Sequence, residues 1–259
     1  MDISVIIPVH NDVRIKRCVE SIDEDVEVIA SMNCPTSEIE EIVREIGIKS
    51  CIIGEKSLSK AYNVGVQKST KENVLFMDSD CVFKKGSLSR LYEKMGSYRI
   101  AKGKIIFNYN SYISSIISKG REFTTSESPQ LFIPLLMVHK SIFDEVGDFN
   151  ENMQFSSCCD FSDKVLAKRI PWVYVPAAQI VHDPLSIKAD LRSAYRYGAG
   201  RSQKHRSRGV VRKPPYLEEL KDYLIRGSKE KGIVTGLYLT LWYGTFTAGF
   251  LHQEFRSRK

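Results

Sequence analysis

The sequence lacks the features of a secreted or disulfide-stabilised protein. Its six cysteines show no CxxC spacing and no paired framework, so we expect reduced thiols in the cytoplasm. The first apolar run, Ile3–Val9, is too short for a signal peptide and follows Asp2 in place of a basic segment, so we expect no secretory leader. Internal repeats and low-complexity segments are also missing, which leaves an ordinary globular chain.

The 259 residues have the composition of a folded protein. With 42% hydrophobic and 27% charged residues, the chain can form one large domain, or one domain with an extension. The net charge of +7 is uneven, because residues 191–259 hold 15 basic and 5 acidic residues while residues 1–190 hold 23 and 26. A basic segment on a nearly neutral body indicates an anionic partner, such as a membrane surface, nucleic acid or a phosphorylated substrate. A solvated charged surface is the alternative.

Apolar runs alternate with helical segments along the first hundred residues. Ile3–Val9 is continuous and β-branched, as in a strand buried on both faces. The alternation predicts an α/β fold with a mainly parallel sheet flanked by helices. The expected strands lie at 3–9, 26–31, 51–53 and 73–77, and the expected helices at 13–22, from Thr36 or Ser37, at 57–67 and at 87–95.

The second part of the chain has a different character. Strands are expected at 101–107, at 131–138 and from Trp172–Val175 to an end near His182-Asp183-Pro184, and the serine-rich stretch 111–128 is either a mobile acceptor loop or an amphipathic helix. Ile233–Leu251 contains no charge and meets the lower length limit for spanning a bilayer. It can span a membrane, lie in the interface, or pack as a soluble helix on the preceding domain, and we expect a basic and apolar helical extension over 191–259.

The tripeptide Asp78-Ser79-Asp80 ends the apolar run at 73–77. Ligands of open α/β sheets bind outside the carboxyl ends of the strands. Two carboxylates there suit a hard divalent cation, which prefers one or two carboxylates, waters and phosphate oxygens. An ordinary turn after a strand is the alternative interpretation.

Short motifs along about residues 3–200 together resemble one enzyme family. They are Ser4–Asn11, Ala61–Gly65, Val74–Asp80, Val146–Glu151, Cys159-Asp160, Val181-His182 and Tyr195–Gly198. In order and spacing they are similar to the motifs of the family 2 glycosyltransferases, which have the GT-A fold. The resemblance implies a GT-A catalytic domain over residues 1–190, with a nucleotide-binding half at about 1–100 and an acceptor half at about 101–190. It also implies inverting transfer of a sugar from a nucleotide-sugar donor, with Mn²⁺ or Mg²⁺.

The resemblance assigns a metal site and a donor site. Asp80 and His182 would hold the metal, which neutralises charge on the diphosphate leaving group; a hydrogen-bonded structural histidine is the alternative for His182. The remaining contacts to the nucleotide-sugar would come from residues at the ends of the early strands and in the following helix. These are Pro8, Val9, His10, Asn33, Lys60, Asp78 and Ser79.

Asp160 is the expected catalytic base. It would take the proton of an acceptor hydroxyl as that oxygen attacks the anomeric carbon from the opposite face. Asp163, one helical turn away, is the rival, and a helix-capping role is the alternative for Asp160. Three residues depart from the family pattern: Asn33 stands in place of an acidic contact to the base of the nucleotide, Tyr62 in place of an arginine, and Cys159 in place of an acid.

We therefore expect a glycosyltransferase at the cytoplasmic face of the cell membrane, acting on a sugar or lipid-linked acceptor in polysaccharide or glycolipid assembly. One alternative is a nucleotidyltransferase, although Pro8–Asn11 contains no glycine for a phosphate loop. The other is a non-catalytic protein that binds nucleic acid or an anionic surface through the basic segment, where Tyr195 and Tyr197 could stack on bases. It leaves the acidic tripeptide without a role, so nucleic acid is not the expected partner.

Overall fold

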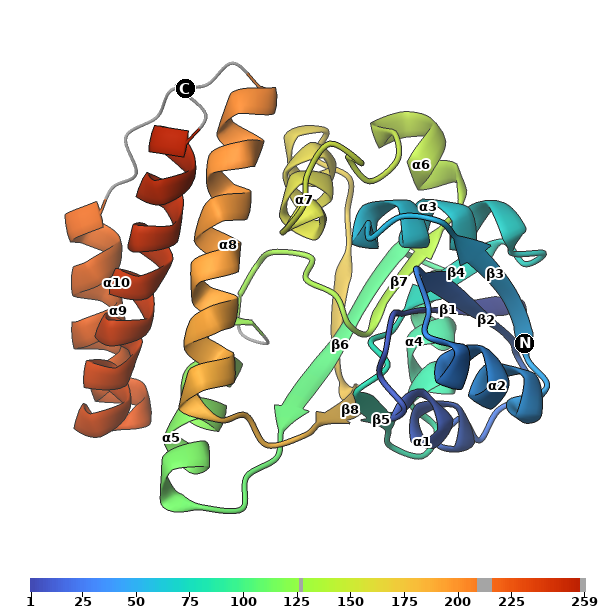
Figure 1. Cartoon of the computed structure of the whole chain (residues 1–259), viewed down its shortest axis with the longest axis horizontal. Helices are drawn as coiled ribbons and strands as arrows, with labels where there is room; N and C mark the ends of the chain where they lie inside the picture. The colour runs from blue at the N-terminus through green and yellow to red at the C-terminus, as the bar shows by residue number, and fades with distance from the viewer. Residues whose placement is uncertain (126–127, 209–215, 257–259) are drawn as a thin grey trace. The chain divides into compact units, whose positions relative to one another are not determined.

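The computed structural model describes residues 1–125, 128–208 and 216–256 (Figure 1). The chain packs into two compact units that are not continuous in sequence. The α/β unit comprises residues 1–106, 129–151 and 158–182, and the helical unit comprises residues 107–128, 152–157 and 183–259. The basic residues Arg212 and Lys213 of the expected extension lie outside the described residues.

The α/β unit is built on an eight-stranded mixed sheet, in the order β3-β2-β1-β4-β7-β6-β8-β5. Strands β1 to β4 pair in parallel, whereas β7 pairs antiparallel with β4 and β6, and β5 pairs antiparallel with β8. The mixed sheet flanked by helices confirms the expected fold class. The strands are β1 (Ile3–Val9), β2 (Glu27–Asn33), β3 (Lys49–Ile53), β4 (Asn73–Phe76), β5 (Cys81–Phe83), β6 (Ile100–Phe107), β7 (Leu136–His139) and β8 (Val173–His182).

Helices follow the early strands as the alternation predicts. Thr36 caps one of them by accepting a hydrogen bond from the Ile39 amide, and Ser57 caps the next by accepting from the Lys60 amide. These caps fix where the chain turns from loop into helix. The helices are α1 (Ile15–Glu20), α2 (Ser37–Ile46), α3 (Leu58–Lys68), α4 (Ser87–Met95), α6 (Ser141–Val146) and α7 (Ser157–Ala167).

The core of this unit explains why β1 and β4 are continuous apolar runs. Every residue of both strands is buried, because both faces of the sheet are covered. Phe76 of β4 packs edge-on against Tyr62 of α3 and against Phe149. Gly65 lets α3 approach the sheet, since a Cβ there would lie 2.4 Å from the side chain of Ile6. This dense packing holds β1 and β4 in place, and with them the residues that follow their carboxyl ends.

Two strands differ from the expectation. The segment after Asp80 forms the short strand β5, which the pattern did not predict because three residues carry too little periodicity. β7 begins at Leu136 rather than at residue 131. Pro134 lies within the expected span, and it has no N–H to donate to a neighbouring strand.

The described part of the helical unit contains four long helices, and its core includes Ala194, Trp242 and Tyr243. The stretch 111–128 forms a helix over its described part, capped by Ser111, which accepts from the Ser114 amide; residues 126–127 of it lie outside the described residues. None of the helices within the described ranges is long and apolar enough to cross a membrane. The helices are α5 (Tyr112–Thr124), α8 (Ile187–Ser207), α9 (Tyr216–Lys231) and α10 (Ile233–Arg256).

Candidate active site at the strand ends

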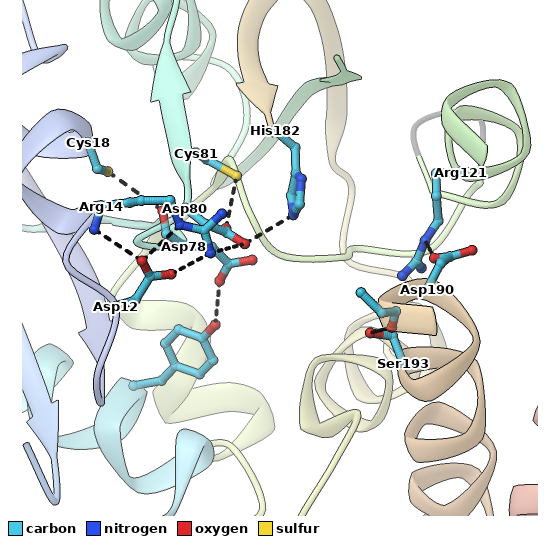
Figure 2. Close-up of polar contacts among 12 residues, drawn as sticks. Asp12, Arg14, Cys18, Asp78, Asp80, Cys81, Arg121, His182, Asp190 and Ser193 are labelled. Atoms are coloured by element: carbon cyan, nitrogen blue, oxygen red, sulfur yellow. Dashed lines mark hydrogen bonds and ion pairs between the residues drawn. The ribbon is translucent and has the colours of Figure 1, made fainter. Parts of the chain in front are cut away.

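Three carboxylates meet at the carboxyl ends of neighbouring strands. Asp12 follows β1, and Asp78 and Asp80 follow β4, which pairs in parallel with β1. A hydrogen bond of 3.3 Å from the Cys81 amide to the Asp78 carbonyl closes the turn. Figure 2 shows the three side chains pointing toward one another. The acidic tripeptide is therefore a turn as well as part of an acidic cluster.

Strand pairing brings His182 to the same cluster. β5 runs antiparallel to β8 with Cys81 opposite His182, so the histidine lies beside the turn that holds Asp80. The Nε2 atom of His182 is 3.2 Å from Oδ2 of Asp80, and the histidine side chain is only 14% exposed. The two predicted metal ligands are thus adjacent in the structure.

Asp80 is held in its ionised form. Burial raises the pKa of Asp80, but the hydrogen bond and charge of His182, together with Arg14, outweigh burial and lower that pKa below its usual value. Arg14 lies 3.6 Å from Oδ2 of Asp80 and also pairs with Asp12 at 2.7 Å. A carboxylate that stays ionised is ready to bind a cation.

Asp78 has the opposite electrostatics. Burial and the neighbouring charge of Asp80 raise the pKa of Asp78 to about 7. The hydroxyl of Tyr62 donates a hydrogen bond of 3.3 Å to Oδ1 of Asp78. Two carboxylates with pKa values driven apart are typical of functional sites.

The donor set fits a hard divalent cation. Side-chain atoms of Asp80, Cys81 and His182 lie within 4.8 Å of one another. Burial, with the charges of Asp78 and Asp80, raises the pKa of Cys81 well above its ordinary value, so this residue stays a thiol and is a poor ligand. Carboxylate oxygen and imidazole nitrogen remain. With waters and phosphate oxygens completing the shell, the pair would suit Mn²⁺, whereas Mg²⁺ would rely mainly on the oxygen ligands.

The predicted donor residues lie around this cluster in different ways. Pro8 and Val9 are buried in β1, so only their main chain is available to a ligand. Nδ1 of His10 lies 2.9 Å from the main-chain oxygen of Asn33, which joins the ends of β1 and β2. Ser79 is half-buried in the turn between the two aspartates.

Lys60 lies on α3 and forms an ion pair with Glu55. Hydrogen bonding and the charge of Glu55 raise the pKa of Lys60, so the side chain is cationic. Its partner in the structure is thus an acid on the preceding loop, and an anionic ligand would have to compete with that acid. No described contact links it to the aspartate cluster.

Asp160 lies in the first turn of α7 and is 2% exposed. Its Oδ2 atom is 3.1 Å from Nζ of Lys164, one helical turn later. Asp163 is more exposed than Asp160. Cys158, two residues before Asp160, packs against the core cluster that includes Phe76 of β4, the strand that leads to Asp78.

Two motif residues have a structural role. Asn63 is buried in α3, and its amide donates to the Phe149 carbonyl at 2.9 Å and to Glu151 at 2.8 Å. The Phe149 amide donates back to Asn63 Oδ1 at 3.0 Å. These bonds hold the loop after α6 against α3. The motifs Ala61–Gly65 and Val146–Glu151 therefore have a structural role near the site.

Sequence reasoning missed Asp12 and Arg14. Both lie in the loop between β1 and α1, and the position after a parallel strand was the signal that could have indicated them. Only the fold shows that Arg14 contacts two of the three carboxylates. The arginine balances the acidic cluster on the side opposite His182 (Figure 2).

Known proteins match both the sequence and the fold. The profile of the family described as Glycosyl transferase family 2 matches residues 4–146, which is more than half of the chain. No curated protein sequence matches it. Among solved structures, the mannosyltransferase PcManGT from Pyrobaculum calidifontis in complex with GDP-Man and Mn²⁺ aligns with a TM-score of 0.65 and 12% identity. That alignment covers 97% of this chain and 86% of the other, and it shows a GT-A-like fold.

Proposed function

Because the chain belongs to glycosyl transferase family 2, we propose that it is an inverting, metal-dependent enzyme whose cation is held by Asp80 and His182. It is a glycosyltransferase, and it takes its sugar from a nucleotide-sugar donor. The observation that carries the proposal is the pairing of Asp80 with His182 at 3.2 Å.

The residues around the pair support this assignment. When bound, the cation would act as a Lewis acid toward the diphosphate of the donor. His182 and Arg14 keep Asp80 ionised for that purpose. Asp78, two residues before Asp80, is proposed to orient the ribose or the waters of the cation, with Tyr62 holding its Oδ1 atom. His10, Asn33, Ser79 and the main chain of Pro8 and Val9 are proposed to contact the donor, with Lys60 as a contact to its diphosphate.

Asp160 is proposed as the general base. The acceptor hydroxyl oxygen forms a bond to the anomeric carbon while the bond from that carbon to the diphosphate oxygen breaks. The hydroxyl proton moves to Asp160, and the nucleoside diphosphate leaves with the electron pair of the broken bond. A single displacement of this kind inverts the anomeric configuration. The position of Asp160 in the first turn of α7, beside the core cluster that includes Phe76 of β4, supports this role.

The solved complex of PcManGT suggests which donor to test first. That protein was solved with GDP-Man and Mn²⁺, so GDP-mannose with Mn²⁺ leads a screen that also includes UDP- and dTDP-sugars with Mg²⁺. We propose a sugar or lipid-linked acceptor in polysaccharide or glycolipid assembly, at the cytoplasmic face of the membrane. The six free cysteines support that compartment.

The metal assignment is tested with Asp80→Asn and His182→Ala. Thermal unfolding is recorded with each nucleotide-sugar, with and without Mn²⁺, because a ligand that binds the native state raises its stability. The wild type is expected to gain stability only when donor and metal are both present, and the two variants to lose that gain. Asp144→Asn is the matched control, since Asp144 is exposed on α6. Full transfer activity of Asp80→Asn, or of the wild type in excess chelator, would refute the metal role.

The base assignment is tested with Asp160→Asn beside Asp163→Asn. Loss of a general base costs about 10²- to 10⁴-fold in rate. We expect Asp160→Asn to lose transfer by that factor while keeping donor-dependent stabilisation, and Asp163→Asn to stay within a few-fold of the wild type. The reverse ranking would assign the base to Asp163.

A further inference from the structure

One face of α10 is apolar and exposed along the length of the helix. Five large side chains on it are between 41% and 66% exposed, and their spacing repeats at intervals of three, four and ten residues, which is one helical face. Gly244 and Ala248 occupy the same face between them, and both are exposed. The large side chains are Val234, Leu237, Leu241, Leu251 and Phe255. A surface helix normally presents charged residues on its exposed face. An exposed apolar stripe therefore indicates a surface that binds a partner.

A hollow of about 300 Å³ adjoins the start of this stripe. Its volume is at the lower end of the range for ligand pockets. The lining comes from α5, α8 and α10 and includes Ile113, Ile116, Ile187, Val234, Leu237 and Leu241.

The polar groups next to the hollow are already paired. Tyr238, which also lines it, donates its hydroxyl to Asp190, and Arg121 neutralises that carboxylate (Figure 2 draws the Arg121–Asp190 pair). The lining therefore offers mainly carbon to a ligand. A hydrocarbon chain is the kind of group that such a surface binds.

Basic side chains lie close in sequence to the lining of this hollow. Each lining helix has a lysine close in sequence to a lining residue: Lys119 on α5, Lys188 on α8, and Lys231 just before α10. Among the described residues of the helical unit, the exposed bases outnumber the exposed acids, which are Glu218, Asp222 and Glu230. The exposed bases are Lys119, Lys188, Arg192, Arg196, Arg206, Arg208, Lys221, Arg226, Lys229 and Arg256.

We propose that this stripe and hollow dock the helical unit on an anionic lipid bilayer. α10 would lie in the interface, with acyl chains against Leu237 and Leu241 and phosphate groups against the flanking lysines. A second copy of the chain fits less well, because a symmetric interface would bring two basic surfaces together. Nucleic acid would use the charge but leave the apolar stripe uncovered. This inference deepens the membrane association proposed above and does not depend on the sugar chemistry.

Vesicle co-sedimentation with the full chain tests the proposal. We expect binding to phosphatidylcholine vesicles that contain about 30% phosphatidylglycerol, and at least about fivefold weaker binding to pure phosphatidylcholine. Leu237→Glu together with Leu241→Glu should weaken binding to the anionic vesicles by about tenfold or more. The control pair is Ile52→Glu with Leu58→Glu, which places the same charges on exposed apolar positions of the α/β unit and should bind as the wild type does.

Two further measurements distinguish docking on lipid from self-association of the chain. Leu241→Trp should show fluorescence quenching by brominated lipid beyond that of the wild type; no added quenching would overturn the docking mode. Sedimentation equilibrium without lipid would overturn the proposal if it showed a dimer that the Leu237→Glu, Leu241→Glu pair disperses. Asp80→Asn should still bind vesicles, so a failed metal assignment and a failed docking surface give different results. Equal binding of the wild type and the glutamate pair would also refute the proposal.

Discussion

Asp78 is the residue at which stability and function conflict most directly. It is half-buried beside Asp80, and partial burial with that neighbouring charge raises its pKa to about 7. In the native state, Asp78 therefore keeps its proton up to about pH 7. In the unfolded chain, the same carboxyl loses its proton near pH 4. Each step in pH between those two values makes folding less favourable. Two adjacent carboxylates in the site therefore lower the stability of the native state at neutral pH.

Asp78→Asn should remove that cost. At pH 8 the wild-type carboxylate is ionised in both states, and the full penalty is present; near pH 4 it is protonated in the native state and the penalty is absent. We expect the metal-free variant to be about 2 kcal/mol more stable than the wild type at pH 8, within the limit of about 4 kcal/mol that three pKa units allow. The gain should disappear near pH 4.

Chemical denaturation in chelator at the two pH values measures this difference. The carboxamide oxygen that Asp78→Asn introduces can still accept a hydrogen bond from the Tyr62 hydroxyl, so this contact survives the change. Asp144→Asn, on the exposed part of α6, should show no such pH-dependent gain. A variant that is equally destabilised at both pH values would mean that Asp78 stabilises the fold. The same substitution should weaken binding of donor and metal, as changes at functional sites often exchange activity for stability.

At the scale of elements, α8 and α10 cross at glycines. A Cβ on Gly249 would lie 2.0 Å from the Tyr195 carbonyl oxygen, and one on Gly198 would lie 1.8 Å from that of Phe246. The two backbones therefore touch where the glycines lie. Trp242 and Tyr243 are buried against residues of α8 and α9, and the apolar stripe of α10 stays exposed.

Gly249→Ala should force the two helices apart. Overpacking of a tight contact costs about 1–3 kcal/mol, and the obstacle here is backbone, which cannot rotate away. Gly244→Ala is the matched control on the same helix, since nothing lies within 4 Å of its added methyl group. Alanine is about 1 kcal/mol better than glycine inside a helix, so the control should be slightly stabilised. Urea denaturation of the two variants measures the contrast, and similar values for both would contradict the close crossing.

At the scale of the whole molecule, charge is divided along the chain. Residues 1–190 are nearly balanced, whereas residues 191–259 hold 15 bases and 5 acids. A charged surface of this kind attracts an anionic partner over a distance set by the salt concentration. The apolar stripe of α10 acts only on contact and is much less sensitive to salt.

The two contributions should separate in a salt titration of vesicle binding. Raising the salt from about 0.05 M to about 0.5 M shortens the screening length several-fold, so most of the preference for anionic vesicles should be lost. Binding that rests on the stripe should remain, and the Leu237→Glu, Leu241→Glu pair should lose that remainder as well. Co-sedimentation at each salt concentration gives the measurement. Binding that falls to zero with salt in the wild type would show that charge alone acts.

The sequence by itself determined the fold class and the acidic turn. β1 and β4 are continuous apolar runs because both faces of a parallel sheet are covered, and such runs can be recognised locally. Asp78 and Asp80 follow one of them, so their place at the strand ends could be predicted. The family resemblance was confirmed, whereas the role of Asp160 stays a prediction.

The family resemblance paired His182 with Asp80, but only the tertiary structure decided how His182 and Arg14 reach these carboxylates. His182 reaches Asp80 because β5 pairs with β8, and β5 is too short to be seen as a pattern. Arg14 reaches it because β1 and β4 are neighbours in the sheet. In the same way, the uncharged run at 233–251 did not reveal which side of α10 is covered, because that depends on the glycines at which α8 crosses it. Pairing and packing between distant segments are properties of the folded chain, and a local pattern does not contain them.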